Sequence, residues 1–590
     1  MSKPLWKVRA LTAALSLAVL ALPVAAAEPA WVTKSNANAK LLLNVAAKYS
    51  PEGASNLGVD GYDEQITDYS RDQFAALNKD NRAVIAELEK RLKAETDPKI
   101  RQDLEILIGS ARDQMRTAAL ERKHFMPFND LAQMLFGVVR STLDPRIPKE
   151  RQKTLLVRLE KYAGLAKGYR PVTELANERL QERLKANKHL LGPYKGEVEQ
   201  AIANGPTLIK GMKELLSKSD LKGWEPAFAA LETQLTAYNV KLKEKMLPRA
   251  RTEHRLPPEV YANNLRQFGV DIAPQELIAK ALTSFAEIRN QMNITASLIA
   301  RERKLPNGDY RAVMLELKKQ QIPADKVMPL YAERLAQLEQ AARQHNVVTL
   351  PERKAVIRLA SPAENARSPA PHMNPPRLIG NTGEYGEFVL TTGAPDASGK
   401  TLAFDDFTHD PGTWSITAHE ARPGHELQFA KMIETGVSTA RAVFAFNSVN
   451  VEGWALYAEA EMQPYEPLDG QLFALQARMM RAARAFLDPM VNLGEISPEG
   501  VKSFLMDEVG LSEGMATQEM QRYTYRMPGQ ATSYFYGYQR LMETRQAAEV
   551  ALRKKFNRKA FNDFVLAQGL VPPALLRKAV MEEFVPAQGK

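Results

Sequence analysis

The chain has 590 residues, of which 45% are hydrophobic and 25% are charged, and its mean hydropathy is −0.34. These values are ordinary for a soluble globular protein that is long enough for two or more substantial cores. The formal net charge is +10, but Lys and Arg interleave with Asp and Glu, as in ELEKRLKAETDPKIRQDLE, which excludes a basic track for nucleic acid. The absence of cysteine excludes disulfide bonds and a lipid-modified cysteine.

The first 27 residues have the pattern of a secretory signal peptide. Lys3, Lys7 and Arg9 form a positive start, an apolar run follows from Ala10 to Leu22, and the small residues of PVAAAE end it. The apolar run, about 13 residues long, is short for a bilayer span. We therefore expect cleavage after Ala27, a periplasmic or secreted protein, and no transmembrane segment after the signal is removed.

Residues 28–250 are predicted to form an N-terminal helical region. Apolar residues recur at spacings of three and four in RQKTLLVRLEKYAGLAKGYR and in EPAFAALETQLTAYNVKLKEKML, as on one face of a helix. Turn-like breaks separate such stretches, and the last of them, Leu247 to Pro258, is the predicted boundary. Residues 251–590 then form a second region.

The second region is predicted to combine helices with a small sheet. Two helical stretches, Pro274 to Lys304 and Ala324 to Gln344, come first. The segments KAVIRLA and YGEFVLTT alternate apolar and polar residues like short strands, and the chain is mostly helical again from Thr413. Asp410 is the predicted N-cap of that next helix, with Pro411 as its first residue. The predicted fold is mainly α and two-lobed, with a small β-sheet beside this helix.

The stretch SITAHEARPGHELQF contains a His-Glu pair followed by a second histidine, a pattern found in zinc proteases. His419 and His425 are six residues apart, whereas the usual spacing is four, and positions six apart differ by about 240° around an ideal helix. Pro423 cannot donate a hydrogen bond to the His419 carbonyl, and Gly424 tolerates unusual backbone conformations. We therefore predict a bulge at ARPG that returns His425 to the metal. The alternative is that RPG ends one helix and both histidines are surface or capping residues.

A third ligand is predicted on the helix of VNVEGWALYAEAEM, about 27 residues further along. Glu452, Ala455 and Glu459 share one face of this helix, while Trp454 and Tyr457 lie on another, apolar face. Glu452 completes a set of two histidines and one carboxylate, the usual catalytic zinc site when one position stays open for water. Glu459 is expected to hydrogen-bond a ligand imidazole. The alternative is that both glutamates are solvated.

Three more residues are candidates for catalysis. Glu420 is not in the ligand set, so it is expected to act as the general base that takes a proton from water and later passes one to the leaving amine. In RYTYRMPGQATSYFYGYQRL, Tyr534 and Arg526 are candidate donors to the developing oxyanion. An arginine there is equally suited to bind a substrate's terminal carboxylate. Most tyrosines of this segment are expected to be packing residues.

The segments HEARPGHELQ, EGWALYAE and RMPGQATSYFYG together resemble the bacterial family named domain of unknown function 885 (DUF885). This resemblance implies a largely helical, often exported zinc hydrolase. The order of the motifs is more remotely similar to thimet-oligopeptidase-like metallopeptidases, and dipeptidyl-peptidase III is a parallel for the widened histidine spacing. The similarity implies the ligands and base given above, with Tyr534 as the oxyanion or substrate contact. It also implies that the strand YGEFVLTT offers an edge to an extended peptide.

The sequence thus predicts a zinc-dependent hydrolase with one zinc ion per chain, and specifically a metallopeptidase that cleaves short peptides. Two alternatives stay open: a zinc hydrolase of a non-peptide amide or ester of the cell envelope, and a non-catalytic helical binding protein. The expected partner is a peptide or small amide, with no nucleic acid. The sequence makes no prediction of the oligomeric state.

Overall fold

The computed structural model describes residues 29–361, 364–365, 370–381, 383–391 and 405–589. The expected signal peptide, residues 1–27, lies outside these residues. The described chain is mainly helical and contains one three-stranded sheet, which confirms the predicted fold class. Among the helices described, none combines the length and apolarity that a bilayer span needs.

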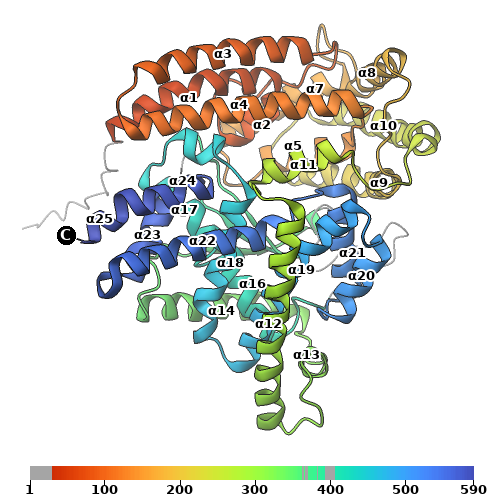
Figure 1. Cartoon of the computed structure of the whole chain (residues 1–590). Coiled ribbons are helices and arrows are strands. Elements are labelled where there is room, and N and C mark those ends of the chain that lie inside the picture. The colour runs from red at the N-terminus through yellow and green to blue at the C-terminus, as the bar shows by residue number, and fades with distance from the viewer. Residues whose placement is uncertain (1–28, 362–363, 366–369, 382, 392–404, 590) are drawn as a thin grey trace, which may run out of the picture.

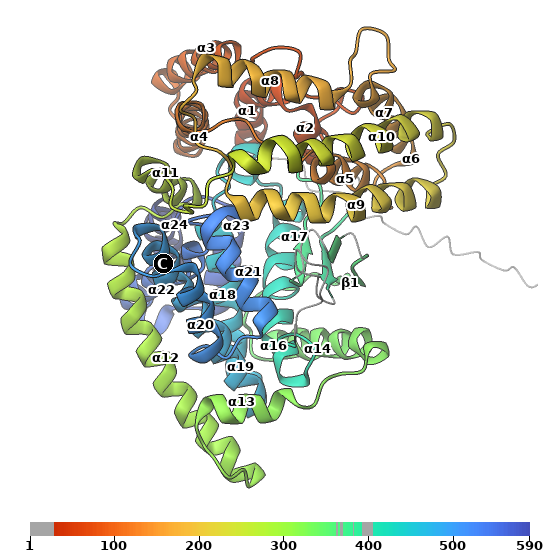
Figure 2. The same cartoon turned by 90° about the vertical axis from the view of Figure 1, so that its right-hand side faces the viewer.

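The helices of the first 250 residues lie together in the upper part of Figures 1 and 2, and we call residues 29–250 the upper lobe. Their buried faces form the apolar cores of this lobe, around residues such as Leu107, Phe136 and Phe228. The helices are α1 (Ala30–Tyr49), α2 (Pro51–Leu57), α3 (Phe74–Ala94), α4 (Pro98–His124), α5 (Leu131–Thr142), α6 (Lys149–Lys153), α7 (Leu155–Ala163), α8 (Val172–Ala186), α9 (Lys195–Lys218) and α10 (Glu225–Lys241), followed by η1 (Leu242–Met246) and η2 (Leu247–Arg249).

The described residues from 251 onward form the lower lobe (Figure 1). Its α-helices are α11 (Pro258–Phe268), α12 (Pro274–Arg303), α13 (Tyr310–Lys318), α14 (Ala324–Gln344), α16 (Asp410–Glu420), α17 (His425–Thr435), α18 (Ser448–Met462), α19 (Leu468–Leu493), α20 (Pro498–Asp507), α21 (Glu513–Gln521), α22 (Thr532–Leu552), α23 (Arg558–Ala567), α24 (Pro573–Ala579) and α25 (Val585–Gly589). Shorter 3₁₀ and π turns are η3 (Ala440–Phe444), η4 (Gln463–Tyr465), η5 (Arg522–Arg526), η6 (Arg553–Lys555) and η7 (Val580–Phe584).

Two predicted helices are confirmed, since α12 and α14 match the expected ranges to within one residue. Long helices of this kind are the easiest to predict because their apolar period repeats over many turns. The division of the chain at residues 250 and 251 into separate folding units stays a prediction.

The sheet consists of β1 (Val356–Leu359), β2 (His372–Asn374) and β3 (Glu387–Leu390), in the order β1-β3-β2. β1 runs parallel to β3, with Val356 opposite Glu387, and β2 runs antiparallel to β3, with His372 opposite Val389. The predicted edge at YGEFVLTT is therefore wrong, because β3 is central and paired on both sides. The edge that faces α16 belongs to β2, a strand too short and too close to prolines for its alternation to be recognised.

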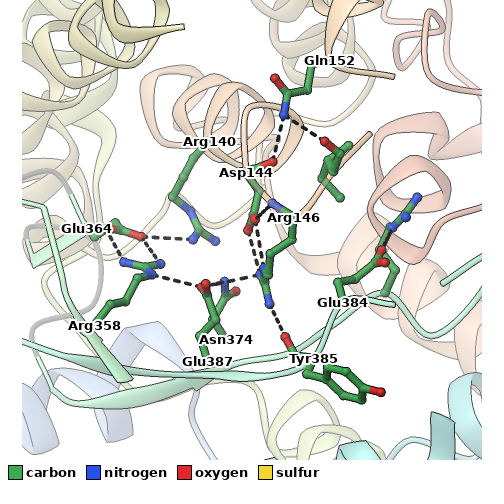
Figure 3. Close-up of polar contacts among 12 residues, drawn as sticks. Arg140, Asp144, Arg146, Gln152, Arg358, Glu364, Asn374, Glu384, Tyr385 and Glu387 are labelled. Carbon is green, nitrogen blue, oxygen red and sulfur yellow. Dashed lines mark hydrogen bonds and ion pairs between the residues drawn. The ribbon is translucent and has the colours of Figure 1, made fainter. Parts of the chain in front are cut away.

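Ion pairs join the upper lobe to this sheet (Figure 3). Arg146, between α5 and α6, donates to the Tyr385 carbonyl at 2.6 Å and lies 3.7 Å from Glu387. Arg358 on β1 contacts the same Glu387 carboxylate at 3.0 Å, and the Asn374 amide on β2 donates to it at 3.2 Å. One buried carboxylate therefore ties all three strands to the upper lobe.

A second tie between the lobes lies where α4 meets η3. Arg441 donates to Asp103 at 2.8 Å, and the hydroxyls of Ser35 and Ser438 donate to the same carboxylate at 2.6 Å each. The side chains of Asp103 and Arg441 are only 1% and 5% exposed. Removing one partner of a buried, hydrogen-bonded pair leaves the other charge without compensation in a region of low polarity.

We therefore expect Arg441→Gln to lower the free energy of unfolding by about 3–5 kcal/mol, as measured by chemical denaturation. The matched control is Arg170→Gln, because Arg170 forms ion pairs with Glu174 and Glu178 at the surface, where such pairs contribute at most about 1 kcal/mol. Equal effects of the two substitutions would contradict a special role of the buried pair.

Candidate metal centre

The helix that carries His419 begins one residue earlier than predicted. His409 is the N-cap of α16, and its Nδ1 accepts a hydrogen bond from the Gly412 amide at 3.2 Å. The predicted cap, Asp410, is the first helical residue instead, because its carboxylate pairs with Arg334 at 2.5 Å. His409 is fully buried, and burial lowers the pKa of its imidazole to about 4, so it is a neutral structural residue.

Residues 421–424 form a tight turn between two helices. α16 ends at Glu420, the Arg422–Pro423 peptide bond is cis, and α17 begins at His425. The predicted bulge within one continuous helix is therefore wrong. Gly424 lies so close to the preceding helix that a Cβ would be 1.9 Å from the His419 carbonyl oxygen. This close approach, and not a left-handed conformation, explains the glycine.

The turn is held by buried polar contacts on both sides. The Arg422 side chain is fully buried, and it donates to Glu426 at 2.6 Å and to Glu339 at 2.6 Å. The indole Nε1–H of Trp454, on the face of α18 predicted to be apolar core, donates to the Pro423 carbonyl at 3.0 Å. Residues of three helices, α14, α17 and α18, thus fix the turn and the imidazole ring of His425, which follows it.

The turn brings the two imidazoles together. The ring centroids of His419 and His425 are 4.7 Å apart, and both residues are buried, so the alternative of two surface histidines is wrong. Glu452 Oε2 lies 3.5 Å from His419 Nε2 and 3.3 Å from His425 Nε2. In a tetrahedral site with ligands at about 2.0–2.1 Å, ligand atoms are about 3.3 Å apart. The three predicted ligands therefore converge at the spacing that one zinc ion requires.

An unpaired buried oxygen at this point also fits a cation. Among the described residues, Glu452 Oε2 is buried and has no hydrogen-bond partner. Most buried polar atoms in proteins do have one, so a carboxylate oxygen that converges with two imidazoles and has no donor fits the binding of a cation. The residues present fit a zinc ion.

Glu420 is a rival for the third ligand position. Its carboxylate, together with the two histidines, offers atoms within 4.8 Å of one another. However, Glu420 Oε1 lies 3.9 Å from His419 Nε2, and its Oε2 accepts the Met373 amide of β2 at 2.7 Å. Glu452 is closer to both imidazoles and its oxygen is free. We assign Glu452 to the ligand set and leave Glu420 beside it.

Carboxylates give the site a strong negative potential. Glu459 accepts from His419 Nδ1 at 2.6 Å, as predicted, and is held by Ser415 at 2.5 Å and Arg481 at 3.2 Å. Burial lowers the pKa of His419, but the carboxylates of Glu452 and Glu459 beside its ring nitrogens outweigh this effect and raise the pKa to about 9. For Glu452, burial raises the pKa, but the two imidazoles hold it well below its usual value. The centre is built to keep an added positive charge.

Tyr534 reaches the centre because α18 and α22 pack unusually closely. A Cβ at Gly537 would lie 2.0 Å from the Val449 carbonyl oxygen, so only glycine permits this approach. The Tyr534 ring stacks on His419 with centroids 6.1 Å apart, and the Arg484 guanidinium lies 4.4 Å from the Tyr534 centroid. The predicted oxyanion donor is therefore next to a ligand.

The centre opens into a cavity of about 530 Å³ between the lobes. The lower lobe lines it with His419, Glu420, Arg481, Arg484, Glu519, Arg522, Arg526 and Tyr534, and α5 and α9 of the upper lobe face them. Arg526 lies at the far wall, where its Nε donates to Gln200 of α9 at 3.2 Å. Most other tyrosines of this segment pack as expected, for example Tyr523, which is fully buried.

The sequence did not reveal several residues that shape this cavity. The Met373 amide, which orients Glu420, left no recognisable signal in its proline-rich surroundings. Arg481 and Arg484 did leave a recognisable signal in the sequence, because α19 carries arginines at three-residue spacing within the otherwise apolar run ARMMRAARAF. Buried arginines in such a run need carboxylate partners, which here are Glu459 and Glu519.

Comparisons with known proteins place the chain in a family. The sequence model of the family described as "Bacterial protein of unknown function (DUF885)" matches residues 51–580, and the chain belongs to that family. No curated protein matches the chain.

Two solved structures share the fold. One is described as the "putative lipoprotein" from Colwellia psychrerythraea: it is 20% identical, with a TM-score of 0.74, and the match covers 94% of this chain and 100% of that one. The other is described as a "putative lipoprotein of unknown function" from Shewanella oneidensis: it is 18% identical, with a TM-score of 0.68, over 94% and 100% of the two chains. At these identities the likeness concerns the fold alone.

The Gly424 contact generates a test of the metal centre. We expect Gly424→Ala to lower the affinity for Zn²⁺ by about 10- to 100-fold, because the new methyl group displaces the His419 carbonyl and with it the imidazole. Titration with Zn²⁺ in a competing chelator measures this. The control is Gly109→Ala on α4, where an added Cβ meets nothing within 4 Å. Unchanged affinity in the Gly424 variant would contradict the proposed role of the turn.

Proposed function

We propose that the protein is a zinc-dependent hydrolase, with short peptides as the preferred substrates. The observation that carries the proposal is the position of Glu452 Oε2, which is unpaired and lies 3.3 Å and 3.5 Å from the Nε2 atoms of His425 and His419, of which His419 lines a cavity. His419, His425 and Glu452 would hold the ion. When bound, zinc supplies a Lewis acid that polarises a carbonyl and makes water more acidic.

Glu420 is the proposed general base. It lines the cavity beside His419, and the Met373 amide fixes one of its oxygens at 2.7 Å while the other lies 3.9 Å from His419 Nε2. A carboxylate anchored in this way has one oxygen available for proton transfer. It accepts a proton from the attacking water and delivers it to the leaving nitrogen.

Tyr534 is the proposed donor to the oxyanion. Burial and the negative charge of Glu452 raise the pKa of its hydroxyl, so it stays protonated and able to donate at neutral pH. Glu459 lies 2.6 Å from His419 Nδ1 and would hold the proton on that nitrogen, which would leave the Nε2 lone pair available to bind a metal ion.

The cavity supports small substrates. A volume of about 530 Å³ is within the range of small-molecule sites and holds a few residues of extended peptide but no folded domain. Its polar lining, with arginines and carboxylates on facing walls, suits a peptide better than an apolar ester. A non-peptide amide of similar size is the second candidate substrate for the same centre.

We also propose that the protein acts outside the cytoplasm. The N-terminal pattern of a signal peptide supports export, and the two proteins that share the fold are described as putative lipoproteins. The sequence contains no cysteine to carry a lipid, so an unlipidated, exported form is proposed for this chain.

The proposal predicts about one zinc ion per chain in purified protein, and a hydrolytic activity that a chelator abolishes and zinc restores. Glu420→Gln should keep the zinc and lower kcat by at least about 100-fold, because the base is lost while the ligands remain. Metal analysis beside a peptide-library assay measures both quantities.

His425→Ala should lose the zinc and the activity together. Glu549→Gln serves as the control, because Glu549 pairs with Arg545 on the outer part of α22 and does not line the cavity. Full activity in the Glu420 variant would rule out the assigned base, and metal-free wild-type protein would rule out the centre itself.

A further inference from the structure

Two arginines stand one π-turn apart on the part of the cavity wall that the lower lobe forms. Arg522 and Arg526 are the first and last residues of η5, and both line the cavity into which the metal centre opens. Two like charges at this spacing repel each other, and no structural role requires them both to face a cavity.

The carboxylate nearest to them is already used. Glu519 accepts two hydrogen bonds from Arg484, at 2.6 Å and 2.8 Å, and a third from the Tyr523 hydroxyl at 2.8 Å. Arg522 Nη1 lies 3.5 Å from Glu519 Oε1, and this buried nitrogen has no hydrogen-bond partner among the described residues. Arg484 and Arg522 thus share the single carboxylate of Glu519, and the third arginine, Arg526, has no carboxylate partner among the described residues.

Arg526 lies within 4 Å of no carboxylate of the described residues. Its polar contact is the neutral Gln200 side chain, at 3.2 Å. Burial lowers the pKa of Arg526; the neighbouring Tyr525 side chain offsets this in part, and the charge of Arg522 adds to it. An arginine in this condition is a binding site for an anion, because its fork of N–H groups matches a carboxylate.

The acidic groups of the opposite wall do not cancel this charge. Asp130 and Glu197 line the cavity from the upper lobe, and burial raises the pKa of both, that of Glu197 to about 7. Glu197 also faces Arg251, whose charge lowers its pKa in part. Among the described residues, no ion pair joins Asp130 or Glu197 to Arg522 or Arg526, so neither carboxylate is their direct countercharge.

We propose that Arg522 and Arg526 bind a carboxylate of the substrate, so that the protein acts on peptides with a free carboxylate close to the scissile bond. This inference rests on the proposed function, which places the scissile bond at the metal centre. The C-terminal carboxylate of a short peptide and an acidic side chain near its end offer the same chemistry.

The distance between Arg522 and the candidate metal ligand His419 sets how many residues can separate the substrate's carboxylate from the scissile bond. The Arg522 guanidinium lies 5.8 Å from the Tyr534 centroid, and that ring stacks on His419 at 6.1 Å. Arg522 is therefore separated from the ligand by a single aromatic ring. An extended peptide advances about 3.3–3.6 Å per residue, so one to three residues span this gap. The proposed substrates are cut close to their C-terminal end.

Three peptides of one length test the inference: one with a free C-terminus, one amidated with a terminal Glu, and one amidated with a terminal Gln. The zinc-loaded mature protein should show a kcat/KM at least about tenfold higher for a carboxylate-bearing peptide than for the neutral one. A preference for the first alone assigns the C-terminus, and a preference for the first two equally assigns any nearby carboxylate. Equal rates for all three overturn the inference.

Binding to the Glu420→Gln protein separates this inference from the proposed function. Tighter binding of the carboxylate peptides there, without hydrolysis by the wild type, supports the anion site and contradicts the peptidase. Hydrolysis by the wild type with equal binding of all three peptides contradicts only the anion site. Calorimetric titration gives the dissociation constants, and this comparison needs no arginine variant.

Arginine variants locate the site. Arg526→Gln should lower kcat/KM for the carboxylate-bearing peptides about tenfold more than for the neutral peptide, chiefly through KM. Arg526→Lys should restore part of the preference, because the charge returns without the fork. Arg522→Gln is the second variant, and Arg170→Gln at the surface is the control. An equal fractional loss of kcat/KM for all three peptides would mean that Arg526 only stabilises the structure.

Discussion

The contact between Gly424 and the His419 carbonyl is the constraint on which the candidate metal centre depends. Only a residue without a Cβ lets α17 start directly against the end of α16, and this closeness compensates for the long spacing of the two histidines. Arg422 and Trp454 then fix the turn from opposite sides through hydrogen bonds to α17, α14 and the turn itself. Because the glycine contact sets where α17 begins, the position of His425 relative to Glu452 follows from it.

The cavity is polarised from one end to the other. Carboxylates surround His419, while Arg522 and Arg526 face the same space without adequate countercharge. Under the proposed function, a peptide that enters with its carboxylate toward the arginines would bring its last amide carbonyls to His419 and Glu420. The same field opposes the reverse orientation, so charge alone gives the substrate a direction in the cavity.

Much of the centre could be predicted from sequence because its chemistry is local. His419, Glu420 and His425 belong to one short motif, and the periodicity of the next helix placed Glu452 and Glu459 on a shared face. The turn itself could not be predicted, since a bulge and a helix break use the same Pro and Gly, and only packing against α14 and α18 decides between them. β2 escaped detection because three residues carry no periodicity, and the mistaken edge at β3 followed from its absence. The pairing of Arg484 with Glu519 joins distant helices, which no single-sequence pattern encodes.

Two groups of buried ion pairs frame the space between the lobes, one at Glu387 and one at Asp103. Mobile ions screen exposed charges effectively but reach buried ones poorly. We therefore expect the distance between the lobes to depend little on the salt concentration of the surrounding solution. For an exported enzyme, as proposed here, this matters in practice: its surroundings change in salinity without the cell's control, and its working dimensions stay the same through such changes.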